Sequence, residues 1–152
     1  MPKGVELSHK ALTAYVVNTQ SPADPSGVQD ATLVAVPLFH IAGATTMLGS
    51  IWSGRKLTIL PAFDPSGWLS MVEKEKVTHA MVVPTMLKRI MEVADFDKYD
   101  ISSLQLITYG AAPMPFEVVR RAIDVFTCGL MNAFGQTEST RSEEHTSELQ
   151  SP

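Results

Sequence analysis

The sequence predicts an α/β protein whose mostly parallel sheet is flanked by helices. Short apolar runs alternate along the chain with segments of helical length, and each run ends at a proline or a glycine. A continuous apolar run is typical of a strand that is buried on both faces of a parallel sheet. With 152 residues, 45% of them hydrophobic and 18% charged, the composition indicates a globular chain of about one domain.

The first half of the chain contains three expected helices and two expected strands. Ser8 is suited to cap the first helix, because its hydroxyl can accept a bond from a backbone N–H of the first turn. The two apolar runs of this half each stop at a proline. The expected order is a helix over 9–20, a loop over 21–30, a strand over 31–36, a helix over 41–53, a strand over 57–60 and a helix that begins at Asp64-Pro65.

The second half continues the same alternation. Its expected order is a strand over 79–83, a helix over 84–93, a strand over 104–109, a helix over 115–126 and a strand over 130–134. Such βαβ units form a parallel sheet, and ligands bind outside the carboxyl ends of its strands. The loops in which we therefore expect the site are Pro37–His40, Pro84–Thr85, Gly110–Pro113 and Gly135–Glu138.

Charge and composition exclude several classes of protein. The net charge is −4 and the basic residues form no run, which argues against binding to nucleic acid. No apolar stretch approaches the ~20 residues of a membrane span. Cys128 is the one cysteine, so an internal disulfide framework and a multi-cysteine metal site are excluded. With no signal-peptide pattern at the N-terminus, we expect a cytoplasmic protein.

The segment 141–152 differs from the rest of the chain. It has one apolar residue in twelve and neither helical nor strand periodicity. Residues 141–151 match the translation of a common short-read sequencing adapter. We therefore expect read-through of an adapter there, with residues 1–140 as the native protein.

Four motifs, in register along residues 1–140, resemble those of the adenylate-forming superfamily, which includes acyl-CoA synthetases, luciferases and adenylation domains of peptide synthetases. Residues 1–9 resemble the end of its phosphate-loop signature, Thr-Gly-x-Pro-Lys-Gly-Val-x-x-Ser-His. Residues 37–40, Pro-Leu-Phe-His, resemble its Pro-x-Phe-His motif. Residues 109–113 resemble its Gly-Gly/Ala-Ala-Pro segment, and residues 132–138 resemble its aromatic-Gly-x-Thr-Glu motif. The resemblance implies a fragment of the large N-terminal domain of an acyl-CoA synthetase, within which Met1 is an internal position.

The resemblance also implies ATP, Mg²⁺ and CoA as reactants and cofactor, and it assigns roles to individual residues. The resemblance implies catalytic roles for Thr137 and Glu138, with Glu138 as the metal ligand. It implies that His40 and Ala111 bind the acid substrate. The residues expected at the nucleotide are Lys3, Gly110, Ala111, Ala112, Asn132, Ala133, Phe134, Gly135, Gln136 and Thr137.

For several of these residues a purely structural role is the alternative interpretation. Lys3 has the composition of a solvated surface lysine, although its Pro-Lys-Gly-Val context favours phosphate binding. The pair Thr137-Glu138 can equally begin a helix as a cap and a first-turn acid. Phe134 stands where the family usually has tyrosine, which removes a hydroxyl and keeps the stacking surface. His40 is interpreted as binding substrate, not as a general base.

The reaction that the resemblance implies proceeds through acyl-AMP to an acyl-CoA thioester. No aspartate follows Phe39 to anchor an amino group, and no aspartate or arginine lies near the acid-binding loops, which favours an acid with an apolar tail. Ile41, Ala44, Thr85 and some of the methionines are expected to line its tunnel. The alternatives are an adenylation domain that loads an amino or aryl acid onto a carrier protein, and a non-catalytic α/β interaction module. We expect the 152-residue chain alone to lack synthetase activity.

Overall fold

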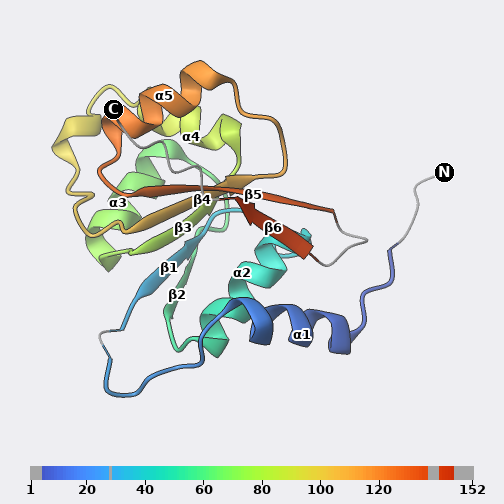
Figure 1. Cartoon of the computed structure of the whole chain (residues 1–152). Coiled ribbons are helices and arrows are strands. Elements are labelled where there is room, and N and C mark those ends of the chain that lie inside the picture. Colours follow the sequence, from blue (N-terminus) through green and yellow to red (C-terminus); the bar gives the residue numbers. More distant parts are fainter. Residues whose placement is uncertain (1–4, 28, 137–140, 146–152) are drawn as a thin grey trace, which may run out of the picture.

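The computed structural model describes residues 5–27, 29–136 and 141–145, and of these the side chains of Phe134, Gln136 and residues 141–145 are not described. Within these residues, one sheet has the strand order β2-β1-β3-β4-β5-β6 (Figure 1). The first five strands in this order pair in parallel, and β6 pairs with β5 in the antiparallel direction. The predicted α/β class with a mostly parallel sheet is confirmed.

The elements follow the predicted alternation of helix and strand. The strands are β1 (Ala31–Val34), β2 (Lys56–Ile59), β3 (His79–Val82), β4 (Leu106–Gly110), β5 (Gly129–Gln136) and β6 (Arg141–His145). The helices are α1 (His9–Thr19), α2 (Ile41–Trp52), α3 (Pro65–Glu75), α4 (Pro84–Met91) and α5 (Phe116–Val125), with a 3₁₀ turn over Phe96–Lys98.

The helices form one layer on each face of the sheet, as Figure 1 shows, with α3, α4 and α5 on one side and α1 and α2 on the other. The larger core lies under α3–α5, where Trp68, Leu69, Leu87 and Ile90 pack on Ile107 and are fully buried. The smaller core lies under α2 and consists of the buried residues Val34, Val36 and Met81. Burial of these side chains is the main force that holds both layers to the sheet.

Side chains fix where the helices begin. The Ser8 hydroxyl accepts a bond from the Ala11 N–H at 3.1 Å, which confirms it as the N-cap of α1. The Asp64 carboxylate accepts from the Gly67 N–H at 2.7 Å and caps α3, whose first turn contains Pro65 as predicted. The longest described helix, α2, has 12 residues, and no described helix is long and apolar enough to cross a membrane.

Strand β6 was not predicted, because residues 141–145 lack a strand periodicity. They pair with β5, from Gln136 opposite Arg141 to Asn132 opposite His145. Pairing of backbone groups requires no apolar side chains, so an available sheet edge can organise a polar segment. β5 is also longer than the expected 130–134, since its length follows from its neighbours β4 and β6. Adapter read-through over 141–152 stays a prediction.

Candidate functional site

His40 lies at the carboxyl edge of the sheet, where the chain leaves β1 and enters α2. Its ring nitrogen Nδ1 accepts a bond from the Ala42 N–H at 3.3 Å, so His40 is the N-cap of α2. The proton of the neutral ring therefore sits on Nε2. The side chain is exposed, which leaves an Nε2–H donor at the positive end of the α2 dipole.

Gly43 allows α2 to pack tightly on the turn before it. A Cβ at this position would lie 2.3 Å from the Pro37 carbonyl oxygen, which is far inside van der Waals contact. The same carbonyl accepts the His40 N–H at 3.0 Å. A glycine in the first turn of α2 thus fixes the position of His40 relative to the end of β1.

The two motifs that the sequence assigns to the nucleotide lie side by side. Gly110, the last residue of β4, pairs with Ala133 of β5, and Tyr109 pairs with Asn132. Ala111 follows with φ of +68°, in the left-handed region that non-glycine residues rarely adopt. Ala111, Ala112 and Asn132 are exposed. The backbone of both motifs is therefore open to a ligand at this edge.

The remaining predicted residues are placed only in part. Gly135 is exposed near the end of β5, and Phe134 and Gln136 belong to the same strand by their backbones. Lys3, Thr137 and Glu138 lie outside the described residues, so the assignments of catalysis, phosphate and metal to them stay predictions. Among the residues that are described, no three His, Cys, Asp or Glu side chains are grouped in a way that would hold a metal ion.

A cavity of about 280 Å³ lies between α2 and the sheet. One face of α2 forms its wall, through Ala42, Thr45, Thr46 and Gly49 at helical spacing. Its floor consists of residues from β1, β3, β4 and β5, among them Met81, Thr108, Met131 and Ala133. Ala42 is two residues from His40, and Ala133 is the partner of Gly110, so one end of the cavity lies at the carboxyl edge.

Only some of the residues expected to line the acid tunnel line this cavity. Met81 lines the cavity as one of the methionines expected to do so, but Ile41, Ala44 and Thr85 are not among the lining residues. The α2 residues that do line it lie on the face of the helix turned to the sheet, and only the fold settles which face that is. Met91 belongs to the larger core on the other side of the sheet, and Met86 packs against both cores.

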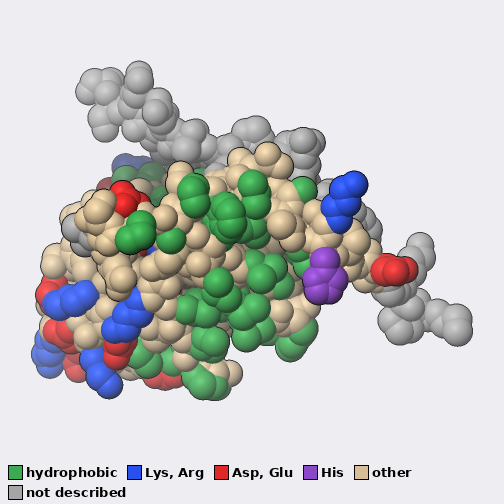
Figure 2. All heavy atoms as spheres, turned by 90° about the horizontal axis from the view of Figure 1, so that it is seen from below, with side chains coloured by type: hydrophobic (Ala, Val, Ile, Leu, Met, Phe, Trp, Pro, Cys, Tyr) green, Lys and Arg blue, Asp and Glu red, His purple; other side chains and the backbone are tan. Residues whose placement is uncertain are grey.

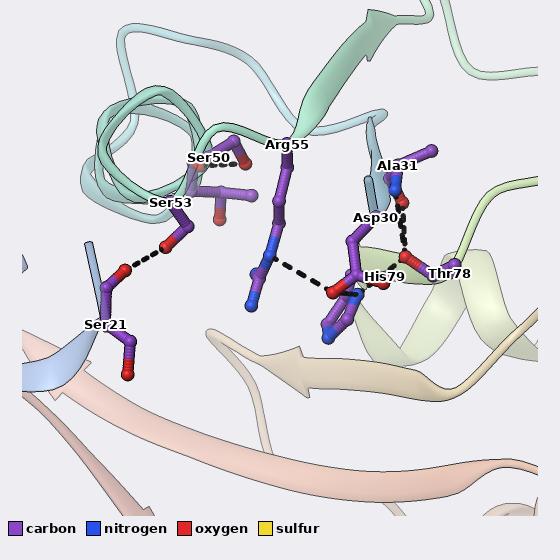
Figure 3. A network of polar contacts seen from close by, with 9 residues as sticks. Ser21, Asp30, Ala31, Ser50, Ser53, Arg55, Thr78 and His79 are labelled. Atoms are coloured by element: carbon purple, nitrogen blue, oxygen red, sulfur yellow. Dashed lines mark hydrogen bonds and ion pairs between the residues drawn. The ribbon is translucent and has the colours of Figure 1, made fainter. Parts of the chain in front are cut away.

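The far end of the cavity is polar, and sequence reasoning missed it. Arg55, just before β2, and His79, the first residue of β3, both line the cavity. Asp30 joins them: its Oδ2 lies 3.9 Å from Arg55 Nε and 3.9 Å from His79 Nδ1 (Figure 3). We call Asp30, Arg55 and His79 the polar end of the cavity. Burial, followed by the nearby Arg55 charge, lowers the pKa of His79.

Thr78 orients the polar end. Its hydroxyl accepts from the Ala31 N–H at 2.9 Å, donates to the Ala31 carbonyl at 3.0 Å and lies 2.8 Å from His79 Nδ1. These bonds tie the start of β3 to the start of β1. The contact of His79 with Asp30 and the bonds of Thr78 with Ala31 could not be predicted from the sequence, because they join residues almost 50 positions apart and depend on the strand register.

Comparison with known proteins matches a family model and gives several relatives named as CoA ligases or synthases. A family model described as AMP-binding enzyme matches residues 1–145. A feruloyl-CoA synthase from Amycolatopsis sp is 36% identical over 139 residues, which cover 91% of this chain and 28% of that protein. A 4-coumarate–CoA ligase from Arabidopsis thaliana is 31% identical over 144 residues, with 91% and 26% covered. The chain spans about a quarter of the length of these curated relatives.

Solved structures agree with the sequence relatives. A fatty acyl CoA synthetase from Mycobacterium tuberculosis has a TM-score of 0.80 at 27% identity, over 91% of this chain and 27% of that one. The amide bond synthetase McbA from Marinactinospora thermotolerans has a TM-score of 0.80 at 26% identity, over 95% of this chain and 28% of that one. Since the family model covers nearly all of its residues, the chain belongs to the family of AMP-binding enzymes.

Proposed function

We propose that the chain is part of a cytoplasmic, ATP-dependent acyl-CoA synthetase, within its large N-terminal domain. In the first step a carboxylate oxygen of the acid attacks the α-phosphorus of ATP, and the bond to pyrophosphate breaks to give acyl-AMP. In the second step the sulfur of CoA attacks the acyl carbon, the thiol proton is lost and AMP leaves. The relatives named as CoA ligases and synthases support this reaction class.

The observation that carries the proposal is the meeting of the cavity with the two nucleotide motifs at one edge of the sheet. The cavity lining includes Ala133, which pairs with Gly110, and Ala42, in the first turn of α2. An acid that fills the cavity would present its carboxylate beside the exposed backbone of Ala111. That position is also near the α2 N-terminus, which favours an anion.

His40 is suited to hold the reacting oxygens. Its Nε2–H is free to donate because Nδ1 is occupied by the Ala42 N–H. A positioned donor that meets developing charge stabilises the transition state more than the ground state. In this role His40 binds and orients the carboxylate or the α-phosphate, and it transfers no proton.

The nucleotide would lie against Gly110–Ala112 and Asn132–Gln136, with Lys3 and Thr137 at its phosphates. The exposed backbone at Ala111, Ala112 and Gly135 fits a flat base that approaches closely. Mg²⁺ held by Glu138 would offset the charge of the phosphates. Glu138 falls outside the described residues, so this ligand is proposed from the sequence motif alone.

The acid has an apolar body of modest size. Small-molecule sites usually measure ~300–1,000 Å³, and this cavity, at about 280 Å³, lies just below that range. It extends along β4 from Leu106 to the level of Gly110, about 13 Å at ~3.3 Å per residue. Met81 and Met131 contribute apolar surface between the two ends of the cavity. An aromatic or medium-length acid fits these dimensions.

The apolar surface around α1 and α2 favours a larger parent protein. Figure 2 shows this face, on which hydrophobic side chains gather while charged ones lie mainly to one side. Val17 of α1 and Ile51 and Trp52 of α2 are 47%, 63% and 39% exposed. Contiguous apolar surface marks a contact region, and we propose that the remainder of the synthetase covers it.

The experiment uses the open reading frame that extends this chain in the source DNA. The purified protein is given ATP, Mg²⁺, CoA and a panel of aromatic and medium-length acids, and thioester formation is followed by mass spectrometry. Acyl-CoA and AMP are the expected products. Acyl-AMP without any thioester would favour the carrier-protein alternative, and neither product from a folded protein would favour a non-catalytic module.

A further inference from the structure

The cavity ends in two side chains that offer opposite hydrogen-bonding groups. Figure 3 shows the end of the Arg55 side chain and the outer ring nitrogen of His79 on one side of the network, away from Thr78. Both residues line the cavity, with side chains that are 24% and 17% exposed. Each is therefore largely removed from solvent and still accessible to a ligand.

The bonds around Thr78 assign the proton on His79. The single hydroxyl proton of Thr78 goes to the Ala31 carbonyl at 3.0 Å, so its oxygen can only accept from His79 Nδ1, which is 2.8 Å away. The Asp30 carboxylate, 3.9 Å from the same nitrogen, favours a proton there as well. The neutral ring thus has Nδ1–H and presents Nε2 as a hydrogen-bond acceptor.

Charge at the polar end is balanced. Asp30 offsets the positive charge of Arg55, and the lowered pKa of His79 keeps its ring neutral at pH 7. A carboxylate placed there would meet the lone pair of Nε2 and no uncompensated positive charge, while losing its hydration. A hydroxyl group meets both side chains well, because it can donate to His79 Nε2 and accept from the guanidinium of Arg55.

We propose that the polar end recognises a hydroxyl group at the end of the acid that is remote from its carboxylate, as in a phenolic acid. The cavity then offers Met81 and Met131, beside threonines of α2 and β4, to the body of the acid, and a donor–acceptor pair to its far oxygen. Arg55 and His79 determine specificity and take no part in the chemistry. That the ligand is the substrate acid rests on the proposed function, whereas the recognition of a hydroxyl does not.

The test uses the 152-residue chain and three probes that carry no carboxylate. These are 4-propylphenol, 4-propylanisole and propylbenzene, titrated against protein labelled with ¹³C at the methionine methyl groups. Met81 and Met131 line the cavity and report where a probe binds. We expect the phenol to bind about tenfold more tightly than propylbenzene and the ether to fall between them.

Variants separate the two contacts. His79→Phe removes the acceptor, so the phenol should lose its advantage over the ether. Arg55→Met removes the donors, so the ether should bind no better than propylbenzene, while the phenol keeps the part of its advantage that comes from donation to His79. His9→Phe on α1 and Arg120→Met on α5 are matched controls outside the cavity lining, and the order of the probes should not change in them.

The proposal is overturned by either of two results in the unmodified chain, whatever the variants do. They are no shift at Met81 and Met131 with any probe, or equal binding of phenol and propylbenzene. Retention of the phenol's full advantage in folded His79→Phe would also overturn it. If the phenol preference holds while the extended protein forms no acyl-AMP, the proposed function fails and the hydroxyl site stands.

Discussion

A Cβ atom on Gly110 would lie 2.2 Å from the carbonyl oxygen of Ala133. The two residues pair in the parallel ladder between β4 and β5, and each belongs to a different motif that is predicted to bind the nucleotide. The absence of a side chain at position 110 therefore lets the two motifs approach each other at the carboxyl edge. The shape of the candidate nucleotide site depends on this contact.

Gly110→Ala should destabilise the chain by about 2 kcal/mol, because overpacking against a fixed backbone carbonyl forces the strands apart. The midpoint of urea unfolding measures this. Gly27→Ala is the matched control, since a Cβ there would lie 3.5 Å from its nearest neighbour, in ordinary contact. Equal midpoints for the two variants would show that β4 and β5 are not held as closely as described.

Thr32→Val should stabilise the chain by about 1 kcal/mol. The Thr32 side chain is 2% exposed, and its buried hydroxyl oxygen has no hydrogen-bond partner among the described residues. A methyl group of similar shape removes that unsatisfied group. Thr58→Val, the same change in neighbouring β2, serves as the control for strand propensity. A lower unfolding free energy for Thr32→Val would mean that the hydroxyl has a partner.

The lowered pKa of His79 predicts a loss of stability in acid. Below its usual value of 6.5 the unfolded chain binds a proton at this residue that the folded chain does not, so the unfolding free energy falls with falling pH. The effect is absent above 6.5, grows as the pH falls through the folded-state pKa and then levels off. Asp30 and Arg55 are the charged groups that face the ring.

Chemical unfolding of the wild type and His79→Gln at pH 7.5 and pH 5 measures the effect. The difference between the two pH values should be smaller in the variant, since its side chain has no proton to gain. An equal difference in both proteins would show that the pKa of His79 is the same in the folded and unfolded states.

His40→Ala in the extended protein should lower the rate of acyl-AMP formation by at least about tenfold, because it removes a donor aimed at the reacting oxygens. It also removes the cap of α2. His40→Asn retains a capping acceptor, so a comparison of the two variants separates the helix effect from the lost donor. Unchanged rates in both would assign His40 to structure alone.

The 152-residue chain by itself should form no thioester. It spans about a quarter of the length of its curated relatives, and the exposed surface of Val17 and Ile51 indicates further contacts. Incubation with ATP, Mg²⁺, CoA and an aromatic acid, analysed by mass spectrometry, tests this. Acyl-CoA above the level of a protein-free control would contradict it.

The parallel sheet was predictable because each buried strand is a local apolar run that stops at a proline or glycine. β1 and β3 are examples, with prolines at positions 37 and 84 soon after each strand ends. The ends of the elements were less predictable, since β5 extends to Gln136 through pairing on both of its edges. β6 has no local signal at all, because its pairing is made by the backbone.

The candidate site, like the fold, was predictable from the sequence only in part. His40, Gly110 and Ala133 were predicted from motifs, and the fold brings Gly110 and Ala133 together. The polar end of the cavity was not predicted, because Arg55 and His79 meet only through the register of three strands. No motif contains them, and their spacing along the chain matches no helix or strand period.

Acid-dependent exchange of labelled pyrophosphate into ATP tests the central claim most directly, because it reports acyl-AMP formation whatever the acceptor of the acyl group. The extended protein is assayed with Mg²⁺ and with a phenolic acid, its deoxy counterpart or no acid. Exchange that requires acid, and is faster with the phenolic one at low concentration, is the predicted result. A folded protein that shows no acid-dependent exchange with either compound, or with the rest of the acid panel, would contradict the assignment to adenylate formation.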